Sequence, residues 1–331
     1  MTTKYNNVYL EGVATVVGPY EHAGPLSKKF DRFYNDLYFS EKSFEKAEIH
    51  LMKESIDVLL KKMNLKKDNV DLFFGGDLQN QITSASFSAL KLQVPFIGIY
   101  AACATNTLGL ILASEFIESK KASKCIVSVS SHNMVSEKQF RNPTEYGAPK
   151  PSSATFTATG GASALLSCNK KDIKIESSTI GKVVDMGQTD ANNMGACMAA
   201  AAGDTIYRHL KDLNRDVSYY DLIVTGDLGK YGKEILIEYM QKEYGIDLSK
   251  NYNDCGIMLY DTKRQKEVQA GGSGPVCSAL VVYGDVIPKL RNKDLKRVLY
   301  VATGALFNPT LVFQKENILS IAHAVSLEAI N

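Results

Sequence analysis

The sequence has no long apolar run. None of its segments approaches the about 20 consecutive apolar residues that a membrane-spanning helix needs, although 45% of the residues are hydrophobic. The first seven residues, MTTKYNN, also lack the basic and then apolar layout of a signal peptide. We therefore expect a soluble chain that folds in a cytosolic compartment, so that any membrane association must be peripheral.

A dense basic block and paired cysteines are also missing. The formal net charge of +2 is close to neutral, which argues against nucleic acid as a partner. The six cysteines are scattered, without a Cys-x-x-Cys pair or a matching pair of histidines. A disulfide framework and a zinc site are therefore not expected.

Cys103 is the residue that says most about a possible function. It lies where the strand-like run 95–100 gives way to a helix-like pattern. At the first turn of a helix, unpaired backbone N–H groups and the helix dipole favour the thiolate, which is the reactive form of cysteine. Free cysteine is also a common buried packing residue. The position alone leaves a nucleophile, its relic and a packing residue as alternatives.

A helix-loop-strand unit occurs twice in the chain. Residues 56–78 match residues 206–228 at one constant offset of 150, and both copies end in Gly-Asp-Leu. Such self-similarity is typical of a duplicated structural unit. We therefore divide the chain into an N-terminal half, residues 1–170, and a C-terminal half, residues 171–331.

Strands alternate with helices along both halves. This alternation predicts an α/β fold of mainly parallel sheets with helices on their faces. Sheets of this kind place ligands beyond the carboxyl ends of their strands. Such strand ends carry Asp77, Cys103, His132, Asp227 and the pair Thr303-Gly304, and we expect these residues to converge on one cleft.

Two segments resemble the thiolase superfamily. Residues 101–104, Ala-Ala-Cys-Ala, are similar to the nucleophile motif of the type III acyl-carrier-protein synthases, and residues 155–165 resemble their glycine-rich strand. The resemblance implies two similar halves in a five-layer αβαβα arrangement. It also implies a homodimer formed across the sheet edge.

Further motifs look like one branch of that superfamily, the stage V sporulation protein AD family of spore-forming bacteria. They are residues 76–81, 130–133, 139–147, 254–256 and 270–274. The resemblance implies a protein that binds dipicolinate. It further implies a peripheral subunit at the forespore inner membrane, in contact with the other subunits of the complex that takes up dipicolinic acid with calcium during sporulation.

The catalytic partners of the synthase cysteine are replaced in this sequence. The first catalytic histidine of the synthases falls on Asp227, and the second position, Asn or His in the superfamily, falls approximately on Ser273. An acid cannot activate Cys103 as a neutral imidazole does. We therefore expect a pseudoenzyme in which Cys103 is a relic. An active acyl-transferring or condensing enzyme with Cys103 as nucleophile and a purely structural adaptor are the alternatives.

Dipicolinate is a flat aromatic dianion, so its site needs N–H-rich or positive groups and a slot for the ring. The predicted helix starts after Cys103 and after residues 271–274 offer backbone N–H groups to anions; the second segment can also be a simple tight turn. The candidate ligand-binding residues are Cys103, His132, Asp77, Asn80, Arg141, Tyr146, Asp227, Gly272 and Ser273.

These candidates have different expected roles. Arg141 is suited to a carboxylate and Tyr146 to covering the ring. Asp77 and Asp227 can coordinate calcium carried with the ligand or cap the helices that follow them. His132 either faces the cleft or is a buried histidine bonded to backbone.

For the other histidines and for two methionines we expect mainly structural roles. We expect His22 in a loop, His50 and His209 on solvated helix faces, and His323 on a strand of the last hairpin. Met194 and Met198 read as core or interface residues, with a pocket wall as the alternative.

Overall fold

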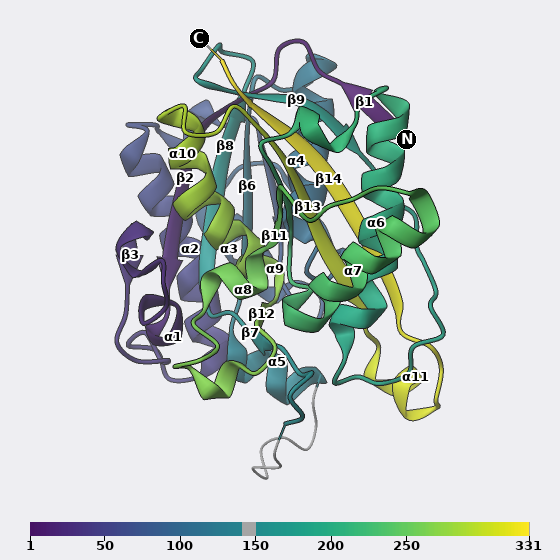
Figure 1. Ribbon diagram of the computed structural model, residues 1–331. Coiled ribbons are helices and arrows are strands. Elements are labelled where there is room, and N and C mark those ends of the chain that lie inside the picture. Colours follow the sequence, from purple (N-terminus) through teal and green to yellow (C-terminus); the bar gives the residue numbers. More distant parts are fainter. Residues whose placement is uncertain (141–149, 331) are drawn as a thin grey trace.

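The computed structural model describes residues 1–140 and 150–330 (Figure 1). Arg141 and Tyr146, two of the predicted ligand residues, lie outside this described part. Within it, every helix is too short or too polar to cross a bilayer.

The N-terminal half forms a mixed sheet with strand order β2-β8-β6-β4-β5. Strands β5, β4 and β6 run parallel, whereas β8 pairs antiparallel with both β6 and β2. Its elements are β1 (Thr2–Lys4), β2 (Tyr9–Val17), α1 (Pro19–His22), β3 (Arg32–Phe33), α2 (Phe44–Lys62), β4 (Leu72–Gly76), α3 (Thr83–Leu92), β5 (Phe96–Gly98), α4 (Thr105–Glu118), β6 (Lys124–Ser131), α5 (Asn133–Phe140), β7 (Phe156–Thr157) and β8 (Gly160–Ser167).

The C-terminal half repeats this sheet with strand order β11-β10-β13-β14-β9. Again three strands are parallel and two are antiparallel to their neighbours. Its elements are β9 (Ile173–Thr179), α6 (Met194–Asp212), β10 (Leu222–Thr225), α7 (Gly229–Tyr244), β11 (Tyr252–Asp254), α8 (Cys255–Leu259), β12 (Gly272–Ser273), α9 (Pro275–Val281), a π-helical turn (Val282–Val286), α10 (Ile287–Arg291), β13 (Arg297–Leu306), α11 (Pro309–Phe313) and β14 (Leu319–Ala329).

The repeat found in the sequence is a repeat of structure. Helices α2 and α6 have 19 residues each and begin and end at the same offset of 150. Strand β10 follows α6 at the place where β4 follows α2. Local chemistry starts α2, because the Ser43 hydroxyl accepts a hydrogen bond from Lys46 N at 3.3 Å.

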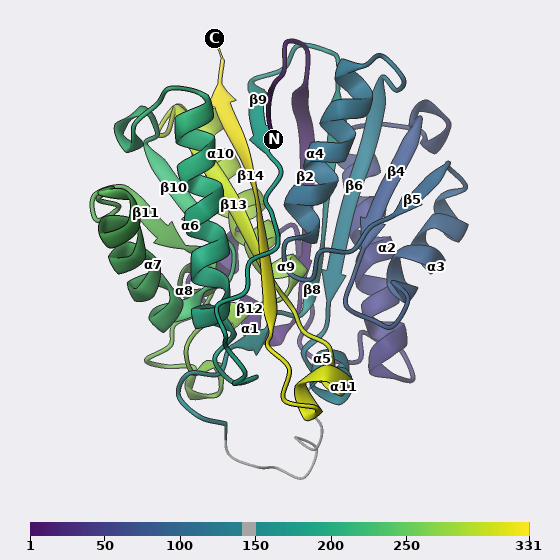
Figure 2. The ribbon, with the colours of Figure 1, turned by 90° about the vertical axis from the view of Figure 1, so that its right-hand side faces the viewer.

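The two halves stack into five layers (Figure 2). Helices α2 and α3 cover the outer face of one sheet, and α6 and α7 cover the outer side of the other. Between the sheets lies a layer that includes α4 and α9, and α4 packs on β4 and β6 of one half and on β13 and β14 of the other. This confirms the predicted thiolase-like αβαβα arrangement.

The strands of the two halves share few pairings in the described part of the chain. Strand β1 pairs with β9 at three positions, and β7 pairs with β12 at two. A single registered pair, Tyr9 and Lys174, joins β2 to β9. Residue 170 lies in the turn between β8 and β9. The halves are therefore held together mainly by the apolar helix layer, where α9 and the π-helical turn are fully buried.

Candidate ligand-binding site

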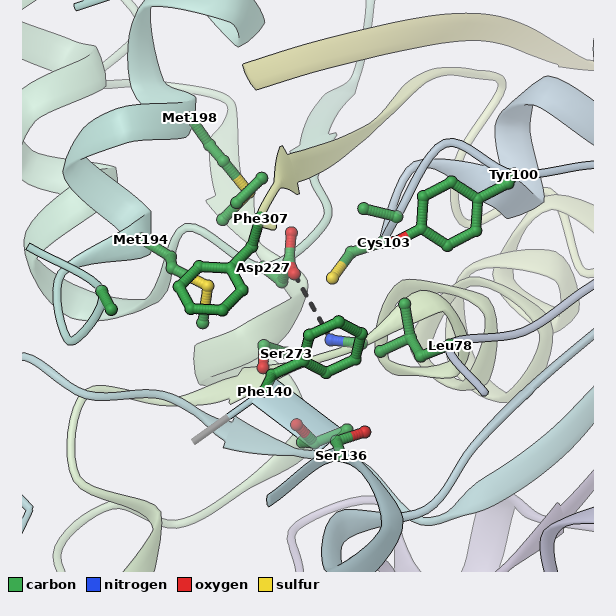
Figure 3. Close-up of a pocket in the computed structure, with 15 residues that line it drawn as sticks. Leu78, Tyr100, Cys103, Ser136, Phe140, Met194, Met198, Asp227, Ser273 and Phe307 are labelled. Atoms are coloured by element: carbon green, nitrogen blue, oxygen red, sulfur yellow. Dashed lines mark hydrogen bonds between the residues drawn. The ribbon is translucent and has the colours of Figure 1, made fainter. Parts of the chain in front are cut away.

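A narrow cavity lies between the halves, beyond the carboxyl ends of the central strands (Figure 3). Its volume is about 50 Å³, well below the roughly 300–1,000 Å³ of ordinary small-molecule pockets. A bound ring must therefore displace side chains of the wall. The cavity is lined by Leu78, Tyr100, Ala102, Cys103, Ser136, Phe140, Thr157, Ala191, Met194, Met198, Asp227, Ser273, Gly274, Ala305 and Phe307.

Two phenylalanines, one from each half, meet at this cavity. The rings of Phe140 and Phe307 lie edge to face, with centroids 6.0 Å apart and planes at 82°. Phe140 ends α5, and Phe307 follows β13. Their contact makes the cavity narrow, and separating the two rings is the simplest way to enlarge it.

The turn that carries Cys103 is held by close backbone packing. Ala102 has a φ of +48°, a left-handed conformation that side chains rarely adopt. A Cβ at Gly304 of β13 would overlap Ala101 O and lie 3.1 Å from Ala104 N. Gly304 of the second half therefore packs directly against the turn that carries Cys103. This turn lies at the start of α4, and it directs the Cys103 sulfur into the cavity.

Asp227 is the acidic group of the cavity. Its buried carboxyl is hydrogen-bonded to the Cys103 thiol, accepts a 2.6 Å hydrogen bond from Thr303 Oγ1, and receives a long one of 3.4 Å from Gly274 N. The pKa of Asp227 is raised to about 7, chiefly by burial and also by the charge of Asp254, while the hydrogen bonds from Cys103, Thr303 and Gly274 oppose the shift. Asp227 therefore changes charge near neutral pH.

Asp77, the equivalent of Asp227 in the repeat, does not line the cavity. Its two oxygens accept hydrogen bonds from Gln79 N at 2.9 Å and Ala85 N at 2.8 Å, which caps the start of α3. Burial raises its pKa to about 6. The structure thus gives Asp77 the capping role rather than a place beside Cys103.

Asp254 performs the capping role in the second half, and sequence reasoning gave it no function. Its carboxylate accepts hydrogen bonds from Leu228 N at 3.0 Å and Gly229 N at 2.9 Å. Because Asp254 satisfies the start of α7, Asp227 is left to face the cavity. The only signal in the sequence was the motif 254–256, in which Asp254 precedes Cys255 and Gly256.

None of the five histidines, all of them in the described part, lines the cavity. His132 is buried against Phe39 and Phe44; its Nε2 bonds to Leu37 O at 2.8 Å, and burial lowers its pKa to about 4. The structure thus shows the backbone-bonded alternative. The expectation of a solvated His209 is wrong, because Thr179 and Tyr220 enclose the ring.

The remaining histidines also serve structure. His22 ends the short helix α1 rather than lying in a loop, and its ring stacks on Phe33 at 3.6 Å. His50 is part-exposed on α2, with Glu41 and Glu54 around it. His323 lies on β14, as expected, and accepts a hydrogen bond from Gly181 N at 3.1 Å.

The other predicted ligand residues divide between the cavity and its surroundings. Ser273 lines the cavity, whereas Gly272 is buried beneath it in the short ladder of β12 with β7. Asn80 lies in a neighbouring groove, where its N–H donates to Gln139 Oε1 at 3.1 Å. Met194 and Met198 line the cavity, which is the alternative role considered for them.

The described cavity wall contains no lysine, arginine or histidine. Its polar side chains are those of Cys103, Ser136, Thr157, Asp227 and Ser273, and the rest of the wall is apolar or aromatic. The described residues contain no cluster of three or more acids, histidines or cysteines suited to a metal ion. Sequence reasoning missed Ser136 and Phe307, two further wall residues; the helical spacing of Ser136 and Phe140 was the one signal that could have pointed to Ser136.

A duplicated five-layer fold with a cysteine turned into a cavity between its halves defines a thiolase-like protein. The fold is similar to that of 3-oxoacyl-[acyl-carrier-protein] synthase III from Aquifex aeolicus VF5, with a TM-score of 0.57, 13% identity, and 97% of this chain and 99% of that chain covered. It is also similar to a variant of OleA from Xanthomonas campestris, with a TM-score of 0.62, 13% identity, and 98% and 99% of the two chains covered.

Sequence comparison places the chain within this class. The family model of Stage V sporulation protein AD matches residues 2–328. Stage V sporulation protein AD of Bacillus subtilis (strain 168) is 44% identical over 321 residues, which cover 97% of this chain and 94% of that relative. The chain belongs to the Stage V sporulation protein AD family.

Proposed function

We propose that this sporulation protein is a non-catalytic dipicolinate-binding subunit of the complex that takes up dipicolinate at the forespore inner membrane. In this proposal it is peripheral to the membrane, forms a homodimer and contacts the other subunits of the complex. Membership of the family supports a role in sporulation. The observation that carries the non-catalytic part is the contact of Asp227 with Cys103 in a cavity that no histidine lines.

Condensing chemistry needs more than a thiol. A base must take its proton, and N–H donors must stabilise the oxyanion that forms on the acyl carbonyl. An imidazole can do both in turn, whereas an ionised Asp227 offers no N–H or O–H group. The described wall holds no basic side chain that could replace it. The cavity therefore suits binding better than carbon–carbon bond formation.

The same wall suits a flat ring with polar substituents. Tyr100, Phe140 and Phe307 supply aromatic faces and edges, and Cys103 and Asp227 supply a polar side. Near neutral pH, part of the Asp227 population is protonated and can donate a hydrogen bond to a ligand carboxylate. When it is ionised, Asp227 can instead share a calcium ion with the ligand, because hard cations prefer carboxylate oxygens.

A calorimetric titration with dipicolinate, with and without calcium, tests this proposal. We expect saturable binding that Cys103→Phe abolishes, because the larger side chain fills a cavity of about 50 Å³. Cys168→Phe is the matched control, since Cys168 is an exposed free cysteine. Absence of binding by the unaltered protein in both conditions would refute the proposed function.

One observation favours acyl transfer as a second candidate. Burial places the pKa of Asp227 at about 7, close to that of an imidazole, and its carboxyl is bonded to the Cys103 thiol. Asp227 could then take the thiol proton while Cys103 attacks an acyl-CoA thioester, releasing coenzyme A and leaving an acyl-cysteine. Intact-mass spectrometry after incubation with acyl-CoA donors distinguishes the two: an adduct that Cys103→Ser removes establishes the enzyme.

A further inference from the structure

Ser136 is a buried hydroxyl that neither the fold nor the proposed site explains. It lies on α5 with 5% of its surface exposed, and it lines the cavity. Its Oγ has no hydrogen-bond partner anywhere in the described part of the chain. A buried hydroxyl without a partner costs free energy that a folded chain ordinarily avoids.

Other helical serines of this protein avoid that cost. Ser88 Oγ donates to Ser84 O at 2.8 Å, and Ser114 Oγ donates to Leu110 O at 2.7 Å. Each hydroxyl folds back on the carbonyl four residues earlier, as serines in helices commonly do. The equivalent carbonyl for Ser136 is that of His132, and it accepts a hydrogen bond from the Ser136 backbone N–H but not from the Ser136 hydroxyl. Its hydroxyl is free for a group that enters the cavity.

The place of Ser136 in the cavity gives the second part of the argument. In Figure 3 it lies on the side away from Asp227 and Cys103, with the Phe140 ring and Ser273 between them. The cavity therefore has polar groups on two sides and aromatic or apolar groups between them. That pattern matches a flat ring carrying an anionic group at each of two positions.

We propose that Ser136 Oγ donates a hydrogen bond to the second carboxylate of a ring dicarboxylate whose first carboxylate lies beside Asp227 and Cys103. The inference rests on the proposed dipicolinate binding and assigns a specificity role within that site. Ser136 then selects dicarboxylates over monocarboxylates of the same ring. A monocarboxylate leaves the hydroxyl unpartnered and gains nothing from it.

The test compares Ser136→Ala with the unaltered protein in titrations with dipicolinate and with picolinate, which lacks the second carboxylate. We expect Ser136→Ala to weaken dipicolinate binding roughly tenfold, as for loss of a hydrogen bond to a charged group, and to leave picolinate binding unchanged. Ser88→Ala is the control, because it removes a buried hydroxyl remote from the cavity, and both affinities should stay unchanged.

The outcomes separate this inference from the function on which it rests. Failure of the unaltered protein to bind dipicolinate refutes the function itself. Normal binding by the unaltered protein with no effect of Ser136→Ala overturns only the role of Ser136. An equal loss for both ligands also overturns it, because the hydroxyl would then contact a group that the two ligands share. Ser136→Ala removes no hydrogen bond made by the described residues, so the melting temperature of this variant should not fall.

Discussion

Asp77 and Asp227 occupy equivalent positions after β4 and β10, yet one carboxyl caps a helix and the other faces Cys103. The difference comes from a third acid. Asp254 accepts the backbone hydrogen bonds at the start of α7, so the second copy of the duplicated unit can turn its aspartate into the cavity. The asymmetry of the site is thus produced by one side chain outside the repeated segment.

Stability should depend on pH through Asp227. Its folded-state pKa of about 7 lies above the ordinary 3.8, so between these values the folded protein holds a proton that the unfolded chain has lost. Its contribution to the free energy of unfolding therefore falls as pH rises through this range. Asp227→Asn removes this titratable group. The free energy of unfolding of the variant, minus that of the unaltered protein, should therefore increase by about 1.4 kcal/mol per pH unit from pH 4 to 7.

Urea unfolding followed by circular dichroism, at several pH values, measures this slope. Asp216→Asn serves as control, because Asp216 is fully exposed and hydrogen bonds with Ser218 lower its pKa. It should show no slope between pH 4 and 7. A flat difference for Asp227→Asn as well would mean that the carboxyl is not held in its protonated form.

Dipicolinate affinity without calcium should fall above pH 7. The ionised Asp227 repels the ligand dianion, whereas the protonated form donates a hydrogen bond to it. We expect a loss approaching tenfold per pH unit, with proton uptake on binding visible as a difference in heat between two buffers. Asp227→Asn should bind with little pH dependence. Unchanged affinity of the unaltered protein from pH 6 to 9 would contradict this coupling.

Asp254→Ala should destabilise the second half. The substitution leaves the buried Leu228, Gly229 and Gly256 amides without their acceptor. We expect a loss of about 3 kcal/mol in the free energy of unfolding, measured by urea titration. Asp261→Ala, at a partly exposed turn, should cost under about 1 kcal/mol. Equal effects of the two substitutions would argue against Asp254 as the capping group.

Gly304→Ala should disturb the Cys103 turn. The added methyl group would overlap Ala101 O, and neither backbone can retreat without moving its strand or helix. We expect a loss of about 1–3 kcal/mol in stability and weaker ligand binding. Gly284→Ala is the control, since the nearest atom there belongs to the Phe30 side chain at 3.3 Å. Normal stability and binding in Gly304→Ala would show that the turn tolerates displacement.

Phe307→Ala should speed ligand entry. The substitution removes one of the two rings whose edge-to-face contact narrows the cavity. Stopped-flow mixing with dipicolinate should show a several-fold faster association, because the contact between the two rings no longer has to be broken. Phe313→Ala, at a side chain with 73% of its surface exposed, should leave the rate unchanged. A slower or equal rate in Phe307→Ala would place the route of entry elsewhere.

The duplication was the most reliable information in the sequence. It correctly anticipated the matching of α2 with α6 and of β4 with β10, because copied helix and strand patterns retain their apolar spacing. Which aspartate faces the cavity did not follow from it. That choice depends on the pairing of β10 with β11, which places Asp254 beside Thr225 on the neighbouring strand.

His132 and Ser136 show a second reason why the sequence did not predict the whole site. Both follow β6 in the chain, and only tertiary packing decides their neighbours. The imidazole of His132 bonds to the carbonyl of Leu37, which is distant in the sequence, and Ser136 Oγ has no hydrogen-bond partner among the described residues. One clue was available, since Asn133, Ser136 and Phe140 follow helical spacing and therefore share a face. A polar pair followed by an aromatic residue on one face is typical of a pocket wall as well as of a core.

The helix layer between the sheets also determines what can fold alone. Because α4 packs on β13 and β14 as well as on its own sheet, a fragment that ends near residue 170 would expose the apolar surface that the other half covers. The two halves, residues 1–170 and 171–331, should each be prone to aggregate when they are produced separately. Mixed from the unfolded state, they should recover the native structure by complementation. The duplicated halves are two units of architecture but one unit of folding.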